Sequence, residues 1–265
     1  MLKKLNNMIL ILGGGDVASG VAAVLHRHGW QIVISELPEP LVVRRKVAFA
    51  EAVWEGEQEV EGILAVLTIS DEEIKNILSA GKIAVVVDPD AQVAKRLGFE
   101  VIVDARMLKR FQPIPCQGKT PLIGLGPGFI AGENCLAAVE TNRGENLGKI
   151  LWQGSPEADT GVPAVVEGHG LERVLYSPVE GIMKAHVQIG DFVTKGQILA
   201  EVGGAAIVAP FDGLVRGMLR DGLSVGAHVK VGDIDPRTDP DLAIKISDKA
   251  LITGQSVLQI IESLS

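Results

Sequence analysis

The sequence predicts an α/β fold with a doubly wound parallel sheet, followed by a small β domain and a C-terminal helix. Three observations support this prediction. Short, continuously apolar runs alternate with helical segments over the first hundred residues, a glycine-rich turn follows the first run, and a 32-residue repeat lies towards the C-terminus. Continuous apolar strands indicate burial on both faces, which a parallel sheet covered by helices on each side provides.

Residues 8–36 have the pattern of a strand, a glycine turn, a helix and a second strand that ends in an acid. In Rossmann-like folds this order holds a dinucleotide. The glycines allow a tight turn and close approach of the pyrophosphate, the helix start faces the phosphates, and the acid accepts hydrogen bonds from the ribose. The alternative is an α/β turn that binds nothing. The candidate nucleotide-binding residues are Gly13, Gly14, Gly15, Asp16, Val17 and Glu36.

A basic cluster follows closely after the expected ribose acid. Arg44 and Arg45 come after a loop with two prolines, Pro38 and Pro40. They either begin a solvated helix or bind a second phosphate. Phosphate binding would use two parallel hydrogen bonds, because guanidinium matches phosphate geometry.

Three further apolar runs, at 63–67, 83–87 and 101–103, continue the predicted sheet. Helices are expected between them, the first with Ser70 as its N-cap. Ligands of such sheets lie at the carboxyl ends of the strands. Thr68, Asp88 and Asp104 come at those ends, and each either touches a ligand or caps the next helix.

A proline-containing linker is expected over 111–117. A second glycine-rich loop follows the apolar run at 122–123. Gly124, Gly126 and Gly128 alternate in a loop that could direct backbone amides into an anion-binding nest. A tight turn between two strands is the alternative. Two strands are expected next, over 136–140 and 148–152, and Arg143 in the polar turn between them is a candidate anion contact.

The stretch from 176 to 235 contains an internal duplication. Ser177-Pro-Val-Glu-Gly is echoed 32 residues later by Ala209-Pro-Phe-Asp-Gly. Short repeated β segments with Gly and Asp turns suggest two interlocked halves of a small barrel, and the sequences resemble the two halves of biotinyl and lipoyl domains. In swinging-arm carriers the hairpin between the halves presents a lysine, whereas residues 202–207 here are Val-Gly-Gly-Ala-Ala-Ile. A carrier role is therefore not expected.

These patterns predict four segments. A Rossmann-like nucleotide-binding domain is expected over 1–117, a connecting β region with the glycine loop over 118–170, a barrel-sandwich domain over 171–240, and a helix over 241–265 that docks back. The acidic run from Asp233 to Asp241 has no calcium-loop pattern and is interpreted as a solvated linker.

Composition narrows the function. The net charge of −8 disfavours a nucleic-acid surface, and no apolar stretch is long enough for a membrane span. No histidine spacing predicts a metal site. The two cysteines, Cys116 and Cys135, give no disulfide framework and favour a cytoplasmic location. Cys116 is a candidate for a sulfur or selenium role, and Cys135 is expected to be buried.

Four segments in the same order resemble the YqeB-type accessory proteins of selenium-dependent molybdenum hydroxylases. They are residues 13–56, residues 122–150, the lysine-less repeat, and VGDIDPR with ISDKAL at 231–237 and 246–251. The resemblance implies a maturation factor whose partners are a molybdenum hydroxylase client or cofactor-maturation proteins. Many relatives are expected to carry a histidine where this chain has Glu145.

Three functions remain open. The first is an accessory protein that binds a nucleotide-containing ligand such as a molybdenum-pterin dinucleotide. The second is an NAD-dependent oxidoreductase that uses the same turn, since Glu36 would favour an unphosphorylated ribose. The third is a non-catalytic adaptor. No catalytic residue is predicted, and a homodimer through a barrel edge or the tail helix is possible but not required.

Overall fold

The computed structural model describes residues 7–115 and 118–264. The chain forms two compact units. The first unit comprises Met1–Pro40, Ala48–Asp159 and Ile246–Ser265, and the second comprises Leu41–Val47 and Thr160–Lys245. The architecture is α/β in the first unit and β in the second, as the sequence predicts.

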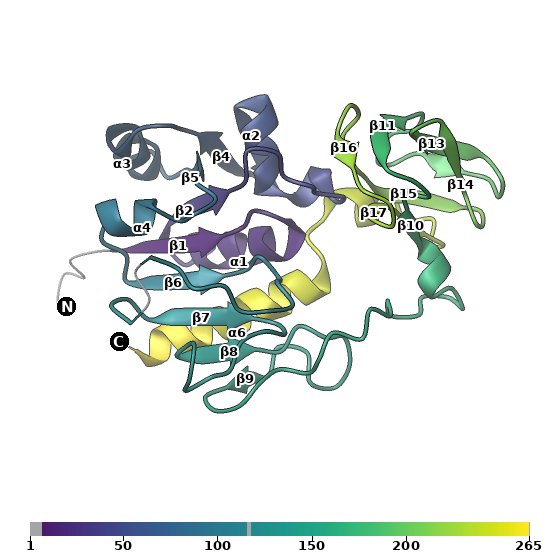
Figure 1. The fold of residues 1–265 in the computed structure, drawn as a ribbon. Helices are drawn as coiled ribbons and strands as arrows, with labels where there is room; N and C mark the ends of the chain where they lie inside the picture. Colours follow the sequence, from purple (N-terminus) through teal and green to yellow (C-terminus); the bar gives the residue numbers. More distant parts are fainter. Residues whose placement is uncertain (1–6, 116–117, 265) are drawn as a thin grey trace. The chain divides into compact units, whose positions relative to one another are not determined.

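The first unit is built on a sheet of nine strands in the order β3-β4-β5-β2-β1-β6-β7-β8-β9 (Figure 1). From β4 to β8 all neighbouring strands are parallel, and β3 and β9 pair antiparallel at the two edges. The strands are β1 Met8–Leu12, β2 Gln31–Glu36, β3 Glu57–Val60, β4 Ile63–Leu67, β5 Ile83–Val87, β6 Val101–Asp104, β7 Leu122–Leu125, β8 Ala137–Val139 and β9 Ile150–Leu151. The core strands β1, β2 and β5 are almost wholly buried, which their continuous apolar runs require.

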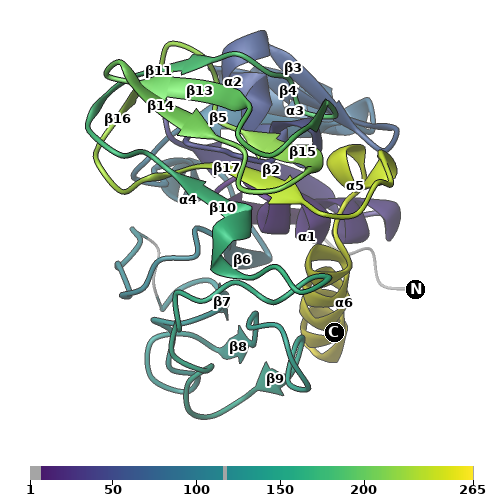
Figure 2. The same cartoon turned by 90° about the vertical axis from the view of Figure 1, so that its right-hand side faces the viewer.

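Helices cover both faces of this sheet. Helix α1 (Asp16–Arg27) lies beside α6 (Asp248–Ser263) on one face, while α3 (Asp71–Ser79) and α4 (Val93–Arg96) lie towards the other (Figures 1 and 2). The short α2 (Ala52–Glu55) contacts β3, β4 and β5. The C-terminal helix predicted over 241–265 is present as α6, which begins later, at Asp248. Ser247 is its N-cap, and its hydroxyl accepts the Ala250 amide. Helix α6 can pack closely on α1 because Gly20 has no side chain. A Cβ added to Gly20 would lie only 2.4 Å from the Cβ of Ala250.

The second unit consists of two four-stranded sheets in the orders β10-β17-β15-β12 and β14-β13-β11-β16. The elements are β10 Val174–Tyr176, β11 Gly181–Ala185, β12 Phe192–Val193, β13 Ile198–Val202, β14 Ala205–Val208, β15 Gly213–Met218, β16 Ser224–Val225, β17 Lys230–Asp235 and α5 Asp241–Ile244. A shift of 32 residues carries the start of β11 onto β15, of β12 onto β16 and of β13 onto β17. The two sheets have equivalent strand orders under this shift, so the duplication predicted from the sequence is confirmed.

The unit boundaries differ from the four predicted segments. Residues 118–159 belong to the first unit, because β7 pairs in parallel with β6 and β8 with β7. Residues 41–47 belong to the second unit, where Val43 fills the space left by the absent side chain of Gly217. None of the described helices is long and apolar enough to cross a membrane.

The acidic run from Asp233 to Asp241 was predicted to be a solvated linker. This prediction was wrong for its first two aspartates. Asp233 and Asp235 lie on β17 and are 5% and 0% exposed. Asp235 accepts hydrogen bonds from the Arg237 guanidinium at 2.8 and 2.7 Å, and Asp233 accepts one from Arg216 at 3.2 Å. Guanidinium partners make the burial of these carboxylates tolerable.

Candidate functional site

The strand order of the sheet reverses at β1, because later strands are added on both sides of it. Its neighbour on one side is β2, and on the other side it is β6, which follows β5 in the chain. In open α/β sheets such a switch creates a crevice at the carboxyl ends of the strands, and ligands bind there. The glycine turn at residues 13–15 occupies this position between β1 and α1.

The first two glycines of the turn donate their amides to the protein itself. Gly13, with a φ of +88°, donates to the carbonyl of Ser35 at 2.8 Å, and Gly14 donates to Oε2 of Glu36 at 2.6 Å. Gly15 is the N-cap of α1 with an extended backbone, and a Cβ added there would meet nothing within 4 Å. The open part of the turn is therefore its helix end.

A segment from Phe49 to Glu51 covers the other side of the turn. The carbonyl of Gly14 accepts the Ala50 amide at 2.9 Å and the Ser19 hydroxyl at 3.0 Å, and the same hydroxyl accepts the Phe49 amide. A Cβ on Gly14 would lie 2.9 Å from the Ala50 nitrogen. Gly14 is thus required for packing within the protein.

Glu36 ends β2 and points back at the turn. Its side chain is buried and also accepts the Leu37 amide at 2.7 Å. Burial raises the pKa of Glu36 above its ordinary value, while the two amide hydrogen bonds act in the opposite direction. Each carboxylate oxygen retains a second acceptor position, so the group could still receive a ribose hydroxyl.

The helix start holds the two remaining residues predicted for this site. Asp16 is the first residue of α1, and its Oδ1 accepts the amide of Val17 at 2.9 Å. Asp16 is partly exposed and Val17 is buried. A ligand that approaches the start of α1 would therefore meet Gly15 and Asp16 first.

Sequence reasoning missed Arg106, which lies against the turn. Its Cα and Cγ would be 3.4 and 3.5 Å from a Cβ added to Gly13. Asp104, at the end of β6, holds the guanidinium through hydrogen bonds of 2.9 and 2.6 Å. The sequence feature that could have identified Arg106 is its position two residues after Asp104, the acid that ends β6.

The glycines of the second loop lie against protein atoms. A Cβ on Gly124 would fall 2.1 Å from the ring of Phe129, one on Gly126 would be 2.7 Å from the Thr141 hydroxyl, and one on Gly128 would be 2.9 Å from the Leu108 carbonyl. These three absent side chains make room for packing. No anion-binding arrangement is needed to explain them.

The three arginines predicted as anion contacts have partners within the protein. Arg143 forms a bidentate pair with Asp248 at 2.8 and 2.6 Å, at the first residue of α6. Arg44 donates to two carbonyls around the end of α5, at 3.0 Å each, and Arg45 donates to the Met218 carbonyl at 2.9 Å. Arg44 and Arg45 make these bonds inside the second unit, whereas the glycine turn belongs to the first.

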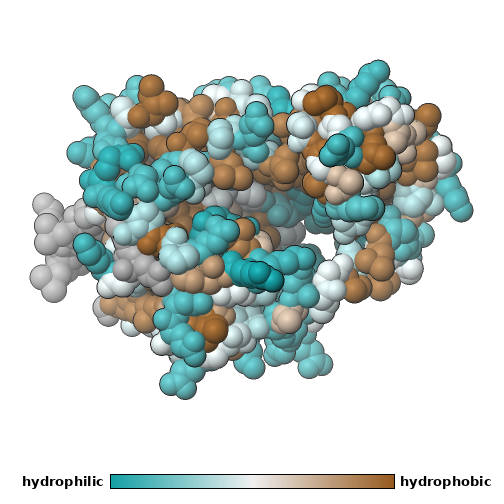
Figure 3. All heavy atoms as spheres, in the orientation of Figure 1, coloured by the Kyte–Doolittle hydropathy of each residue, from teal (hydrophilic) through white to brown (hydrophobic). Residues whose placement is uncertain are grey.

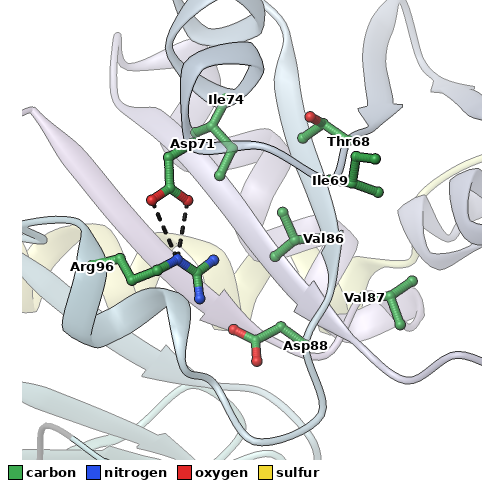
Figure 4. A pocket seen from close by; sticks show the side chains of 8 residues that line it. All are labelled: Thr68, Ile69, Asp71, Ile74, Val86, Val87, Asp88 and Arg96. Carbon is green, nitrogen blue, oxygen red and sulfur yellow. Dashed lines mark hydrogen bonds and ion pairs between the residues drawn. The ribbon is translucent and has the colours of Figure 1, made fainter.

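A cavity of about 170 Å³ opens at the carboxyl ends of β4 and β5 (Figure 4). Asp71 accepts hydrogen bonds from Nε of Arg96 at 3.1 and 3.3 Å, and Asp88 accepts the amides of Gln92 and Val93 at the start of α4. The lining side chains are Thr68, Ile69, Asp71, Ile74, Val86, Val87, Asp88 and Arg96.

Two of the three remaining candidates, Cys135 and Glu145, lie within the described residues. Cys135 is buried as expected, Glu145 is exposed, and Cys116 lies outside the described residues. Within the described ranges no group of three or more His, Cys, Asp or Glu side chains could hold a metal ion.

The chain is similar to a protein of Escherichia coli described as uncharacterized protein YqeB. The two are 41% identical over 254 residues, which cover 96% of this chain and 47% of the E. coli protein. The chain therefore spans about half the length of the curated relative it matches. This match agrees with the YqeB part of the resemblance seen in the sequence, and no family model matches the chain.

Among solved structures, matches include the product-bound ectoine utilization protein EutE (DoeB) of Ruegeria pomeroyi. It is 12% identical, with a TM-score of 0.25, over 85% of this chain and 56% of that one. An aspartoacylase family protein of Mesorhizobium loti is 13% identical, with a TM-score of 0.27, over 86% and 85%.

Proposed function

We propose, from the similarity to YqeB and from the turn after β1, that this protein is an accessory factor of selenium-dependent molybdenum hydroxylases. In this proposal the first unit is a Rossmann-like domain that binds a nucleotide-containing ligand such as a molybdenum-pterin dinucleotide. The protein would hand on, load or modify that cofactor for a hydroxylase client or another maturation protein.

One observation carries the nucleotide-binding part of the proposal. At the point where the strand order reverses, the Glu36 carboxylate lies within 2.6 Å of the amide of Gly14. A carboxylate at the end of β2 next to a glycine turn is the arrangement that positions a ribose beside a pyrophosphate. The partly exposed start of α1 would then attract the phosphates through the helix dipole.

The geometry of the turn suggests which residues would contact the proposed nucleotide. Gly15 and Asp16 at the start of α1 would approach the pyrophosphate, and Glu36 would accept a ribose hydroxyl. Arg106 would supply positive charge, because its Cα and Cγ lie against Gly13 and its side chain is 22% exposed. Gly13 and Gly14 would shape the turn without donating their amides to the ligand.

An NAD-dependent oxidoreductase is the second candidate, favoured by the acid at the ribose position, because a carboxylate there accepts the 2′-hydroxyl of NAD. Both candidates share one site, so the ligand itself separates them. A non-catalytic adaptor would bind neither.

The turn between the two halves of the second unit does not fit a carrier role. We propose that this unit is a lysine-less relative of the biotinyl and lipoyl barrels. The turn between β13 and β14 consists of Gly203 and Gly204, and a Cβ on Gly203 would lie 2.6 Å from the Glu180 carbonyl. This turn offers no amine for a prosthetic group, and a lysine at Gly203 would collide with the backbone.

The test is ligand-induced thermal stabilisation with a molybdenum-pterin dinucleotide and with NAD. A ligand at a hundredfold excess over its Kd adds about 2.7 kcal/mol to the free energy of unfolding. A shift with the pterin dinucleotide alone supports the first function, and a shift with NAD alone supports the second. No shift with either ligand contradicts both and leaves the adaptor.

The variant Gly15→Leu localises any such binding. Gly15 has a φ of −65° and open space around its Cβ, so leucine fits the fold but fills the mouth of the turn. Gly226→Leu in the second unit is the matched control, because a Cβ there meets only Val229 at 3.7 Å. The site is wrong if Gly15→Leu binds as the wild type does.

A further inference from the structure

The cavity between the ends of β4 and β5 lies in line with the proposed nucleotide site. Glu36 on β2 pairs in register with Val87 on β5, and the amide of Asp88 donates to the Glu36 carbonyl at 3.0 Å. Neighbouring strands are about 4.8 Å apart, so this cavity begins about one strand beyond the acid, on the side away from the glycine turn. A ligand that runs from the turn past Glu36 would enter it.

The two sides of the cavity differ in chemistry. Figure 4 shows Ile69 and Val87 on one side, and the guanidinium of Arg96 and the carboxylate of Asp88 on the other. Ile69 is 94% exposed and Val87 is 43% exposed, so apolar surface at this mouth is in contact with water. The cavity joins this apolar wall to a polar side that carries the carboxylates of Asp71 and Asp88 and the guanidinium of Arg96.

The polar groups retain capacity for a ligand. Arg96 uses Nε for Asp71, and Figure 4 shows the two terminal nitrogens of its guanidinium pointing away from Asp71, towards the side on which Val86 and Asp88 lie. Asp88 accepts one backbone amide on each oxygen, and each carboxylate oxygen has a second acceptor position. A planar group with an adjacent donor and acceptor along one edge would satisfy both residues.

The size of the cavity limits the occupant. Its volume of about 170 Å³ is below the roughly 300–1,000 Å³ of pockets that enclose whole drug-sized molecules. A single ring system fits this volume, whereas a complete dinucleotide does not. The volume and the lining together favour a small group with apolar faces and a polar edge.

We infer that this cavity receives the nucleobase of the bound nucleotide, with its faces against Ile69 and Val87 and its edge towards Asp88 and Arg96. Nucleobase edges carry the adjacent donors and acceptors that carboxylate and guanidinium groups recognise. The inference rests on the proposed function, in which the same ligand places its ribose at Glu36 and its phosphates at the start of α1.

The experiment measures the affinities of ADP, GDP, CDP and UDP by calorimetry, beside ribose 5-phosphate and pyrophosphate as probes without a base. The wild type should bind at least one nucleoside diphosphate roughly tenfold or more tightly than either base-free probe, because hydrogen bonds to charged groups contribute that much. Equal binding of base-free and base-containing probes would overturn the inference.

The variant Ile69→Asp tests the apolar wall without removing a buried contact. It should weaken binding of the preferred nucleoside diphosphate roughly tenfold, because the base loses an apolar contact, and leave pyrophosphate binding unchanged. Val165→Asp is the matched control, because Val165 is 69% exposed and belongs to the second unit. It adds the same charge and should change neither affinity.

The outcomes separate the two proposals. If Gly15→Leu abolishes binding of a nucleoside diphosphate while Ile69→Asp binds it as the wild type does, the base site is wrong and the phosphate site stands. If the wild type binds no nucleoside diphosphate, pterin dinucleotide or NAD, both proposals are overturned.

Discussion

The carboxylate of Glu36 and the amide of Gly14 are joined by a buried hydrogen bond of 2.6 Å. This bond ties the end of β2 to the turn after β1, although 22 residues separate the two in sequence. It also orients the acid towards the helix start at which phosphates are expected. The Glu36 carboxylate therefore has a structural role in the turn, whether or not a ribose is bound.

The ionisation of Glu36 gives a pH prediction. Burial raises its pKa in the folded protein, so the native state holds the proton more tightly than the unfolded chain, whose value is near 4.5. The contribution to stability is complete below 4.5 and is lost as pH rises through the folded pKa. In urea unfolding, the free energy of unfolding of the wild type should fall relative to that of Glu36→Gln as pH rises. A difference independent of pH contradicts the raised pKa.

Gly14 and Gly15 should respond differently to a larger side chain. We expect Gly14→Ala to lower the free energy of unfolding by about 1–3 kcal/mol, because its Cβ would press on the Ala50 backbone. Gly15→Ser should change it by no more than about 0.5 kcal/mol, since the site is open and serine is a good N-cap. Chemical denaturation of both variants provides the comparison. Equal losses would show that the turn is not packed as described.

The parallel sheet could be predicted because its inner strands are continuous apolar runs. Strands such as 83–87 are buried on both faces, and this leaves a direct signature in the sequence. Strand β3 (Glu57–Val60) was missed because an edge strand is paired on one side only and carries polar residues.

The candidate site was only partly predictable. The order of strand, glycine turn, helix and acid identified Glu36 beside the turn. The sequence could not distinguish a glycine that admits a ligand from one that admits another part of the chain. Gly124 beneath Phe129 and Gly14 against Ala50 are of the second kind. The proximity of Arg106 to Gly13 depends on strand order, which local patterns do not specify.

The buried ion pairs of the second unit were missed for a related reason. Asp233 and Asp235 have a loop-like local composition, and of their partners only Arg237 is near in sequence, whereas Arg173 and Arg216 come from elsewhere in the chain. Only the pairing of β17 with β15 brings Arg216 near these acids. Long-range pairing of this kind leaves no local pattern.

Asp235 should be essential for the stability of the second unit. Burial alone would raise its pKa, but hydrogen bonds and charge from Arg237, with the charge of Arg173, lower it below the usual 3.8. Its stabilising contribution is therefore present above 3.8 and is lost as pH falls through the lower folded value. We expect Asp235→Asn to cost about 3 kcal/mol at neutral pH, because buried guanidinium charge loses its partner.

The control for this variant is Asp90→Asn, which removes an exposed carboxylate and should have little effect on thermal unfolding. If Asp235→Asn and Asp90→Asn unfold at the same temperature, the buried cluster does not stabilise the protein.

The glycine pair between β13 and β14 offers a matched test of backbone packing. Both residues have positive φ, +56° for Gly203 and +83° for Gly204, so alanine strains either position by about 1 kcal/mol. Only Gly203 also faces the Glu180 carbonyl, 2.6 Å from an added Cβ. We therefore expect Gly203→Ala to be the more destabilising change, by about 1–3 kcal/mol. Urea unfolding that ranks the two variants equally would contradict the close approach.

The thiol of Cys135 should be inert in the folded protein. It lies 8% exposed at the entry to β8, and burial raises its pKa to about 11. At pH 8 the thiolate is then on the order of one molecule in a thousand, and only the thiolate reacts with alkylating reagents. Peptide mass spectrometry after iodoacetamide treatment should show slow modification of Cys135 in the native state and rapid modification in denaturant. Rapid modification without denaturant would mean that β8 opens readily, and that the sheet end carrying the second glycine loop is less firmly packed than the contact between Gly124 and Phe129 indicates.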